Sequence, residues 1–234
     1  MYDTTEKFNS LKAKPVVTVL GIESSCDETA AAVVVNGRDI RSNVIASQVP
    51  VHRRFGGVVP EVASRNHTMA INNVVDEALK TAGVTIADID AIAVTYGAGL
   101  VGALLVGVTA AKALSYATGI PLVKVNHIEG HVAANFAAFP DLEPPFLALV
   151  ASGGHTLILD VAGYNDYKCL GSTRDDAIGE AFDKTARLLG LPYPGGPEID
   201  RLAKKGKNNI SFFHDKKSVN DDFSLSYSGL KTAV

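Results

Sequence analysis

The chain has 234 residues, a length that allows one large domain or two small ones. Hydrophobic residues make up 47% of it and charged residues 20%, and the formal net charge at pH 7 is −3. This composition is that of a globular protein, and it excludes a disordered polymer, a collagen and a strongly basic nucleic-acid coat protein. Two cysteines, Cys26 and Cys169, are too few for a disulfide framework, so we expect a reducing compartment.

Two segments bear on targeting and on membranes. Residues 1–15 form a polar leader of mixed charge without an apolar run, so we expect no signal peptide. Residues 91–111 carry no charge and are long enough to span a bilayer. Four glycines between Gly97 and Gly107 interrupt this segment, which favours a strand, a turn and a buried helix over a membrane span.

The first half of the chain predicts alternating strands and helices. The expected strands cover 16–23, 30–35, 40–49, 89–96 and 122–125, and the expected helices cover 61–82, 101–118 and 128–139. Asn36-Gly37 predicts a type I′ hairpin turn between two of the strands. Gly83 is a natural end for the first long helix. The pattern is typical of an α/β protein.

The opening pattern returns in the second half. Strands are expected over 146–151 and 156–161, with the turn Ser152-Gly-Gly-His155 between them. Ser152 and Ser24 each stand in a turn between two buried strands at the start of a half. This echo predicts two related domains that face one cleft. We place the boundary within 124–145, with a first domain over 16–124 and an incomplete second domain over 125–234 that is short of strands.

The most specific local feature is His127-Ile-Glu-Gly-His131. Two histidines at positions i and i+4 of a helix lie about 40° apart around its axis, so both rings can bind one metal ion. A zinc peptidase needs glutamate directly after the first histidine, whereas Glu129 lies about 200° around the helix. The spacing therefore favours metal binding over peptide hydrolysis, and a third ligand must come from elsewhere. Two helix histidines with a purely structural role remain an alternative.

A second pattern, Gly97-Ala-Gly-Leu-Val-Gly102, matches the G-x-G-x-x-G of dinucleotide-binding folds. Those folds also need a carboxylate at the end of the next strand, which here reads Val123-Lys-Val-Asn126. A tight turn from strand to helix, or a close approach of the backbone to a ligand, are the alternatives.

Further candidates are weaker when each is taken alone. Asp27 and Glu28 place two carboxylates in the first turn, where they could orient a nucleophile, hold a cation or simply face solvent. The glycines of the second turn allow backbone N–H groups to approach a phosphate. Asp183 could bind ribose hydroxyls or be an ordinary acid of a helix start. Tyr193-Pro-Gly-Gly-Pro197 predicts a rigid turn that can lie against a nucleotide, with Asp200 close behind.

A basic stretch lies near the end of the chain. Residues 201–217 carry six lysines and arginines against one aspartate. A solvated loop is the simpler interpretation, and a contact with a phosphate backbone is the alternative.

Several motifs occur in an order that resembles one family. They are Gly21-Ile-Glu-Ser-Ser-Cys-Asp-Glu-Thr29, Val59-Pro-Glu-Val-Ala-Ser-Arg-Asn-His67, His127-Ile-Glu-Gly-His131, Ser152-Gly-Gly-His155, Gly179-Glu-Ala-Phe-Asp-Lys184, Tyr193-Pro-Gly-Gly-Pro197 and Phe223-Ser-Leu-Ser-Tyr-Ser-Gly-Leu-Lys231. The duplicated units resemble the superfamily of actin, sugar kinases and chaperone ATPases. Within it, the motifs resemble the universal tRNA threonylcarbamoyladenosine transferases, formerly described as O-sialoglycoprotein endopeptidases, over residues 19–234.

The resemblance implies a reaction and a site. The threonylcarbamoyl group of threonylcarbamoyl-AMP would pass to the adenosine beside the tRNA anticodon, at position 37, with release of AMP. His127 and His131 would bind one divalent metal ion, Fe²⁺ or alternatively Zn²⁺. Asp27 and Glu28 would lie near the reacting centre. The adenylate would be bound by a second set of residues: Val150, Ala151, Ser152, Gly153, Gly154, Asp183, Gly196 and Asp200.

The resemblance also implies partners and a location. Besides tRNA, the bacterial members work with an inactive paralogue, as a heterodimer, and with an accessory ATPase in the cytoplasm. The helix that begins near Glu61 resembles the docking surface. Family members are longer than this chain, and their additional part carries an aspartate that completes the metal site and an asparagine that contacts the nucleotide. We therefore expect a C-terminally incomplete chain. A metal-dependent peptidase and an ATP-dependent small-molecule kinase are the alternative functions.

Overall fold

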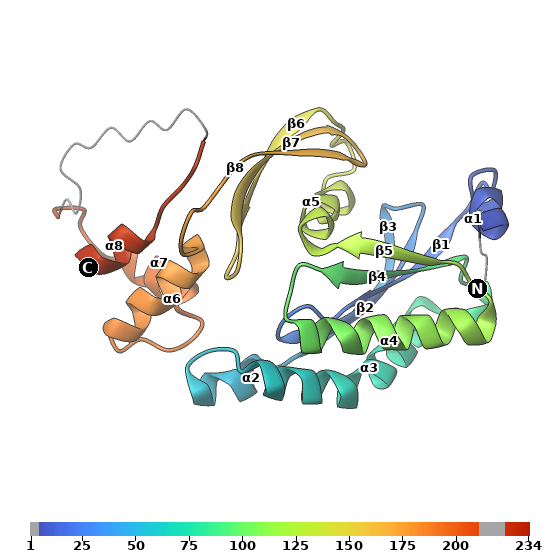
Figure 1. Cartoon of the computed structure of the whole chain (residues 1–234), viewed down its shortest axis with the longest axis horizontal. Helices are drawn as coiled ribbons and strands as arrows, with labels where there is room; N and C mark the ends of the chain where they lie inside the picture. Colours follow the sequence, from blue (N-terminus) through green and yellow to red (C-terminus); the bar gives the residue numbers. More distant parts are fainter. Residues whose placement is uncertain (1–4, 211–222) are drawn as a thin grey trace. The chain divides into compact units, whose positions relative to one another are not determined.

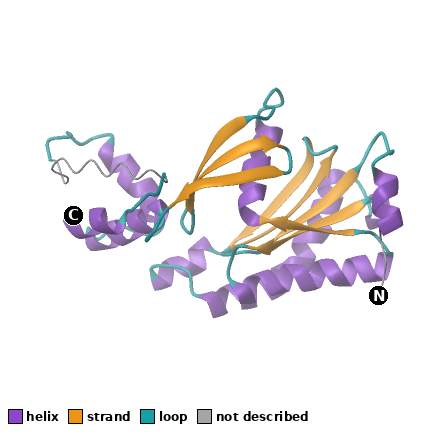
Figure 2. Ribbon diagram, turned by 45° about the horizontal axis from the view of Figure 1, so that its top comes forward, coloured by secondary structure: helices purple, strands orange, loops and turns teal. Residues whose placement is uncertain are grey.

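The computed structural model describes residues 5–210 and 223–234. Contacts between residues divide the chain into two units, Met1–Leu142 and Glu143–Val234. Each unit contains one β-sheet with its own helices (Figures 1 and 2).

The first unit consists of a sheet and the helices that pack on it. In chain order its elements are α1 (Thr5–Leu11), β1 (Thr18–Glu23), β2 (Glu28–Val35), β3 (Asp39–Ser47), α2 (Val49–His52), η1 (Arg53–Phe55), α3 (Pro60–Ala82), η2 (Ile86–Asp88), β4 (Ala91–Gly97), α4 (Val101–Thr118), β5 (Leu122–Asn126) and α5 (His127–Ala138). The five strands run in the order β3-β2-β1-β4-β5. β1 pairs with β2 and β2 with β3 in antiparallel fashion, whereas β1, β4 and β5 are parallel.

The core of this unit lies between the sheet and the layer of α3 and α4. α3 packs against β2 and β3, and α4 packs against β4 (Figure 1). Leu20 of β1 and Ile92 of β4 are fully buried there, and α3 contributes Ile71, Val74 and Ala78 from one face. The spacing of these residues along α3 is that of a helix with one buried stripe, so the apolar pattern decides which face of the helix meets the sheet.

The turns of the first unit follow from single residues. Asn36 and Gly37 both have positive φ, 50° and 71°, which confirms the predicted type I′ turn between β2 and β3. Arg38, next to this turn, donates hydrogen bonds to the carbonyl oxygens of Phe136 and Pro140, each at 2.9 Å, and of Leu142 at 3.1 Å. The hairpin therefore holds the carboxyl end of α5.

The second unit is smaller. Its elements are β6 (Phe146–Ala151), β7 (Thr156–Gly163), β8 (Asp166–Ser172), α6 (Ile178–Leu188), α7 (Gly195–Ala203) and α8 (Ser228–Ala233). The strands form an antiparallel sheet in the order β6-β7-β8. This arrangement repeats that of β1, β2 and β3, so the predicted internal echo is present in the strand pairing.

Three details differ from the prediction. The second unit begins at Glu143, within the expected boundary range of 124–145 but later than residue 125, because α5 packs on β5 and β4 of the first sheet. The predicted strand 40–49 ends at Ser47, since Pro50 lies in the first turn of α2, where its missing N–H is not needed. The expected turn at 193–197 becomes the start of α7, because the Asp183 carboxylate accepts the N–H of Gly195 and holds the first helical turn.

The uncharged segment forms a strand, a turn and a helix, as expected. Within the described residues, α4 is the one helix that is long and apolar enough to cross a membrane, and a single such helix is weak support for a span. It packs on β4 and α3 in the first unit.

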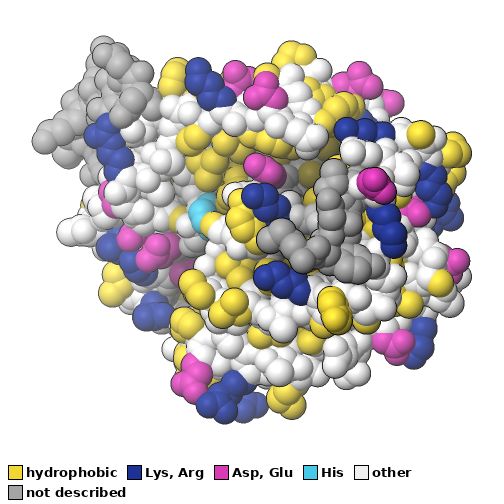
Figure 3. Space-filling model, turned by 45° about the vertical axis from the view of Figure 1, so that its right-hand side comes forward, with side chains coloured by type: hydrophobic (Ala, Val, Ile, Leu, Met, Phe, Trp, Pro, Cys, Tyr) yellow, Lys and Arg dark blue, Asp and Glu magenta, His cyan; other side chains and the backbone are white. Residues whose placement is uncertain are grey.

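Acidic and basic side chains are interspersed over the face of the molecule in Figure 3, with hydrophobic side chains between them.

The buried position of Ile92 gives a direct test of the core. Ile92→Ala should lower the free energy of unfolding by about 2–5 kcal/mol, because a fully buried side chain leaves a cavity. The matched control is Ile40→Ala on the edge strand β3, where the side chain is 52% exposed and the loss should stay below about 1 kcal/mol. Urea unfolding followed by circular dichroism measures both, and equal losses would contradict this packing.

Candidate functional site

The polar groups of the first unit gather where its parallel strands end. Leu20 pairs with Ile92, and Ile92 with Leu122, so β1, β4 and β5 are in register. Their carboxyl ends therefore reach the same edge of the sheet, where ligands bind in open α/β folds. Glu23 is the last residue of β1, and His127 follows β5 directly.

The two histidines lie on one face of α5, as the spacing predicts. Asn126 caps the helix by accepting the N–H of Ile128 at 2.8 Å, which places His127 at its first position. The Nε2 atoms of His127 and His131 are 3.0 Å apart. Two imidazole nitrogens about 2.1 Å from one ion lie roughly 3.0–3.4 Å apart when the angle at the ion is between 90° and tetrahedral. The pair thus has the geometry of two ligands of one ion.

The other nitrogen of His127 contacts a carboxylate that the sequence did not single out. Its Nδ1 is 3.2 Å from Oε2 of Glu23 and 3.1 Å from Oγ of Ser25. Burial alone would raise the pKa of Glu23, but hydrogen bonds from His127, Ser25 and Thr95 outweigh it and lower the pKa to about 2. Glu23 is therefore a carboxylate at neutral pH, and it favours the tautomer of His127 that has its proton on Nδ1.

This tautomer leaves the Nε2 lone pair of His127 directed toward His131. In metal sites, a histidine ligand usually donates a hydrogen bond from its second ring nitrogen to a carboxylate or carbonyl oxygen. This hydrogen bond fixes the orientation of the ring and raises the basicity of the nitrogen that binds the metal. The residues present thus fit a divalent ion with imidazole ligands, such as iron or zinc. Within 5–210 and 223–234 they supply two such ligands, since no group of three or more histidine, cysteine, aspartate or glutamate side chains is arranged to hold an ion.

The turn between β1 and β2 fits closely against the start of α4. Gly99 has φ +155°, and a Cβ at this position would lie 2.6 Å from the carbonyl oxygen of Ser25. That oxygen accepts the N–H of Leu100 at 2.8 Å. Ser24 donates to the carbonyl of Ala103 at 2.9 Å. The glycines of residues 97–102 are therefore explained by close packing against this turn, which supports the tight-turn interpretation of the motif.

The two predicted acids of this turn occupy its end. Asp27 accepts the N–H of Gln48 through its backbone carbonyl, and Glu28 is the exposed first residue of β2. Partial burial and the charges of Asp27, Glu23 and Glu28 raise the pKa of the Cys26 thiol to about 12. Cys26 is therefore a thiol at neutral pH and unsuited to act as a nucleophile. The carboxylate that the structure places on His127 is Glu23.

In the second unit, the predicted glycine turn meets the start of a helix. Val150 and Ala151 end β6, and the Ser152 backbone carbonyl accepts the N–H of Gly179, near the start of α6, at 3.1 Å. A Cβ on Gly179 would lie 2.6 Å from that carbonyl oxygen, so the close contact requires glycine there. A Cβ on Gly153 or Gly154 would meet no other atom within 4 Å. Packing therefore does not require glycine at these two positions, and their backbone is open to approach.

Asp183 joins α6 to α7. Its Oδ1 accepts the N–H of Gly195 at 2.7 Å, and a Cβ on Gly195 would overlap Ala186. Gly196 is expected to contact the adenylate from the family resemblance. A Cβ added to it would lie 3.9 Å from the nearest side-chain atom, an ordinary contact distance. Asp200 is exposed on α7 and pairs with Lys204 at 2.7 Å. The structure thus brings Asp183 and the Gly195-Gly196 pair together.

A second pair of acids, Asp175 and Asp176, holds the segment near the C-terminus. Asp175 accepts the backbone N–H groups of Tyr227 at 2.7 Å and Ser228 at 3.2 Å, and hydroxyl hydrogen bonds from Ser226 and Ser228. The Ser226 hydroxyl and the Tyr227 N–H contribute most to holding the pKa of Asp175 well below its usual range. Asp176 bridges Lys231 and Lys184 at 2.8 and 2.9 Å.

The basic stretch is only partly described. Arg201 pairs with Glu198 and Lys204 with Asp200, each at 2.7 Å. Lys216, Lys217 and Asp215 lie outside the described residues. The two ion pairs on α7 reduce the positive charge available for a phosphate backbone.

Comparison with known proteins decides the family. The family model described as TsaD, tRNA N6-adenosine threonylcarbamoyltransferase, matches residues 39–234. The chain belongs to this family. It is 62% identical over 216 residues to the tRNA N6-adenosine threonylcarbamoyltransferase of Clostridium perfringens (strain SM101), an alignment that covers 92% of this chain and 64% of that protein. It is 59% identical over 221 residues to the same enzyme of Clostridium botulinum (strain Hall), with 94% and 65% covered.

The chain therefore spans about two thirds of the length of these relatives. Among solved structures, the Acidaminococcus fermentans (R)-2-hydroxyglutaryl-CoA dehydratase component A is similar with a TM-score of 0.50 at 12% identity, over 86% of this chain and 63% of that one. This likeness concerns the fold alone. The fold is the α/β type of actin, sugar kinases and chaperone ATPases, as the resemblance implied.

Some groups of the site were absent from the prediction. The sequence pattern places Glu23 and Thr95 in buried strands and Ser25 in a turn, and it predicts no role for them beside His127. The signal that could have found them is their place at the carboxyl ends of β1 and β4, once these strands are recognised as parallel neighbours of β5. Asp175, which holds residues 226–228, has no motif of its own.

The contacts of Asp175 predict a pH dependence. Its pKa is lowered in the folded chain, so the stability it contributes is present above its unfolded pKa of about 3.9 and is lost as the pH falls toward the folded pKa. Asp175→Asn should speed hydrogen exchange at Tyr227 and Ser228 about fivefold at pH 7, a loss of ~1 kcal/mol, and less at pH 3. Asp166→Asn, in β8, is the control. If Asp175→Asn changed the exchange rates equally at both pH values, the Asp175 carboxylate would not be the group that holds Tyr227 and Ser228.

Proposed function

We propose that this chain provides most of a tRNA N6-adenosine threonylcarbamoyltransferase. The observation that carries the proposal is the identity of about 60% to curated enzymes of this name over more than nine tenths of the chain. In the proposed reaction, the exocyclic amine of adenosine 37 attacks the carbamoyl carbonyl carbon of threonylcarbamoyl-AMP. A new C–N bond forms, the bond from that carbon to the phosphate oxygen breaks, the amine loses a proton and AMP leaves.

The adenylate is proposed to bind the second unit. The open backbone of Gly153 and Gly154, beside the start of α6, suits a phosphate group, because backbone N–H groups and a helix N-terminus both favour negative charge. Val150, Ala151 and Ser152 lead into this turn, and Asp183, Gly196 and Asp200 are the further proposed contacts. Asp183 is anchored through Oδ1 on Gly195, which fixes its carboxylate for hydrogen bonds to ribose hydroxyls.

A metal ion is proposed at His127 and His131. When bound, it would supply a Lewis acid that stabilises negative charge on the carbamoyl oxygen. Iron is the proposed metal and zinc the alternative, since imidazole suits both. Glu23 holds His127 through Nδ1, so Nε2, on the side of His131, would be the ligand atom. Asp27 and Glu28 are the candidate carboxylates near the reacting centre.

The geometry gives little support to the peptidase alternative. A zinc peptidase uses a glutamate beside the metal-bound water as its general base. Glu129 is exposed on α5, and the carboxylate that contacts His127 is Glu23, on the nitrogen that faces away from the proposed ion. Glu23 therefore orients a ligand. The kinase alternative is separated by its product, since a kinase would consume ATP and yield a phosphorylated small molecule.

The proposed function can be tested in a chimera. The C. perfringens relative, with its matching segment replaced by this chain, should form threonylcarbamoyladenosine from tRNA and threonylcarbamoyl-AMP, measured by mass spectrometry of digested tRNA. His127→Ala should lower kcat/KM at least about a hundredfold, because the loss of one ligand removes several kcal/mol of charge stabilisation. Glu129→Gln is the control on the same helix and should retain activity. A chimera that melts like its parent but transfers nothing would contradict the proposal.

The proposed partners besides tRNA are the inactive paralogue, in a heterodimer, and an accessory ATPase. The helix expected to dock the paralogue is α3, which packs beside α4. This layer exposes large apolar side chains, with Met69 of α3 at 78% and Val101, Leu105 and Tyr116 of α4 at 74%, 58% and 80%. Large exposed apolar side chains on one helical layer suit a protein interface.

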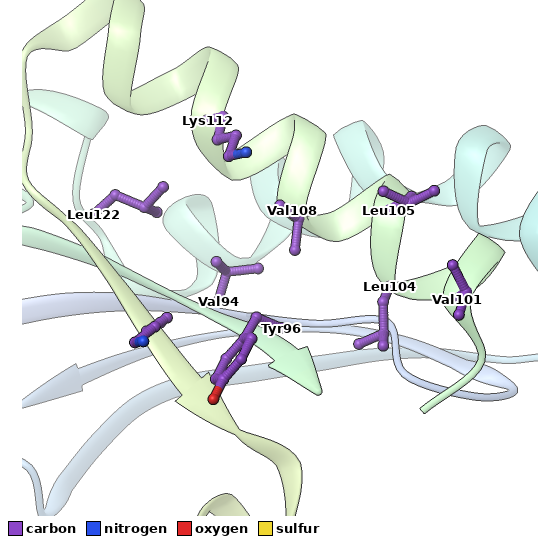
Figure 4. A pocket seen from close by; sticks show the side chains of 9 residues that line it. Val94, Tyr96, Val101, Leu104, Leu105, Val108, Lys112 and Leu122 are labelled. Carbon is purple, nitrogen blue, oxygen red and sulfur yellow. The ribbon is translucent and has the colours of Figure 1, made fainter. Parts of the chain in front are cut away.

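A groove beside α4 adds to this support. It has a volume of about 540 Å³ and is bordered by α4 and by residues of β4 and β5, among them Tyr96 and Leu122 (Figure 4). Leu105 and Val108 line it from the helix, and Lys112 and Lys124 are the charged groups at its border. An apolar groove with two cations suits a partner helix that carries apolar side chains and a carboxylate.

A substitution on α4 tests the docking surface. Leu105→Glu should weaken binding of the paralogue from the same genome at least tenfold, because the carboxylate would be buried at the interface. Ile40→Glu introduces the same charge at an exposed apolar site of β3, outside the α3–α4 layer, and should have little effect. Titration calorimetry measures both constants. Equal affinities for the two variants would place the interface elsewhere.

The cytoplasm is the proposed location, because tRNA and its modification are found there. The two cysteines, Cys26 and Cys169, are unpaired, which is compatible with a reducing compartment.

A further inference from the structure

His67 of α3 is buried directly beneath the turn that carries Ser25. Its exposed fraction is 0%, and its ring nitrogens contact the turn and the strand β2 that follows it. Nε2 is 3.0 Å from the carbonyl oxygen of Cys26, and Nδ1 is 2.7 Å from Oγ1 of Thr29, which is also fully buried. A carbonyl oxygen only accepts, so Nε2 carries a proton and donates it. In the neutral ring, Nδ1 then accepts the hydroxyl of Thr29.

The turn held by His67 contacts the metal-site histidine on its other side. Ser25 Oγ lies 3.1 Å from Nδ1 of His127, and the Ser25 carbonyl accepts the N–H of Leu100. The Asp27 carbonyl, two residues further, accepts the N–H of Gln48. The carbonyl oxygens of Ser25, Cys26 and Asp27 thus each accept a hydrogen bond from a different segment of the chain. Two of these bonds come from backbone N–H groups, and the one to Cys26 comes from the buried side chain of His67.

We propose that His67 is a positioning residue for His127. It acts through residues 26–29, which run from the β1–β2 turn into β2. By fixing the Cys26 carbonyl and the Thr29 hydroxyl, His67 keeps Ser25 where its hydroxyl, together with Glu23, holds the Nδ1 side of the His127 ring. The proposal rests on the metal-binding role of His127 within the proposed function, and it does not depend on which group is transferred.

The chemistry of the contact predicts which replacements keep it. Leucine fills a similar space but leaves the Cys26 carbonyl and the Thr29 hydroxyl buried without a partner, which favours movement of the turn. Glutamine can restore both contacts, because its amide nitrogen donates and its amide oxygen accepts. A residue that only fills space would show no difference between these two variants.

The experiment uses the whole chain with Co²⁺ as the probe. Absorption titration gives the Co²⁺ affinity, and ¹⁵N chemical shifts of the His127 ring report which nitrogen carries the proton. His67→Leu should weaken Co²⁺ binding about tenfold and give a mixture of His127 tautomers, whereas His67→Gln should stay within about threefold of the parent. Ile71→Ala, one turn further along α3 in the core, is the control that lowers stability without altering either measurement.

The outcomes separate this proposal from the proposed function. Unchanged Co²⁺ affinity and His127 shifts in a folded His67→Leu chain would overturn it. Should that variant not fold, Thr29→Val removes only the hydroxyl that meets Nδ1 and should shift both measurements in the same direction. If the parent chain binds no Co²⁺, the metal proposal fails, and the tautomer of His127 in the two His67 variants still decides the positioning role.

Discussion

The parallel register of β1, β4 and β5 is the constraint on which the first unit's site depends. Because Glu23, Thr95 and His127 each stand at the carboxyl end of one of these strands, their approach is set by strand pairing. The buried stripe of α3 and the small buried residues of α4 keep the sheet packed against its helices. Packing of ordinary apolar residues thereby fixes the positions of a few polar ones, and catalysis needs such prior placement.

Close packing between the β1–β2 turn and the start of α4 is a second feature that fixes the positions of the polar groups in this site. The Ser25 carbonyl can accept the Leu100 N–H while the Ser25 hydroxyl reaches His127, because Gly99 brings no side chain into this contact. The glycine motif of residues 97–102 thus allows two backbone segments to pack closely. It resembles a dinucleotide-binding motif only in its sequence. The absence of a carboxylate after β5 was the sequence feature that separated these two interpretations.

The sequence predicted most strands and helices, the type I′ turn and the histidine pair, because each depends on local periodicity or spacing. His127 and His131 share a helix face whatever surrounds them. The contact of Glu23 with His127 joins residues 104 positions apart, so no local pattern could reveal it. The start of α7 at Gly195 likewise depends on Asp183, since Gly-Gly-Pro alone indicates a turn. The division at Leu142 follows from the packing of α5, which the sequence does not specify.

The groups that hold the Nδ1 side of His127 come from residues before it in the chain. Glu23 and Ser25 precede it, as do His67 and Gly99, and His131 follows within about one helical turn. During synthesis, domains fold as units from the N-terminus. The histidine pair can therefore be assembled while residues after Leu142 are still in the ribosome. A nascent chain stalled shortly after the first unit has emerged would already hold His127 between Glu23, Ser25 and His131.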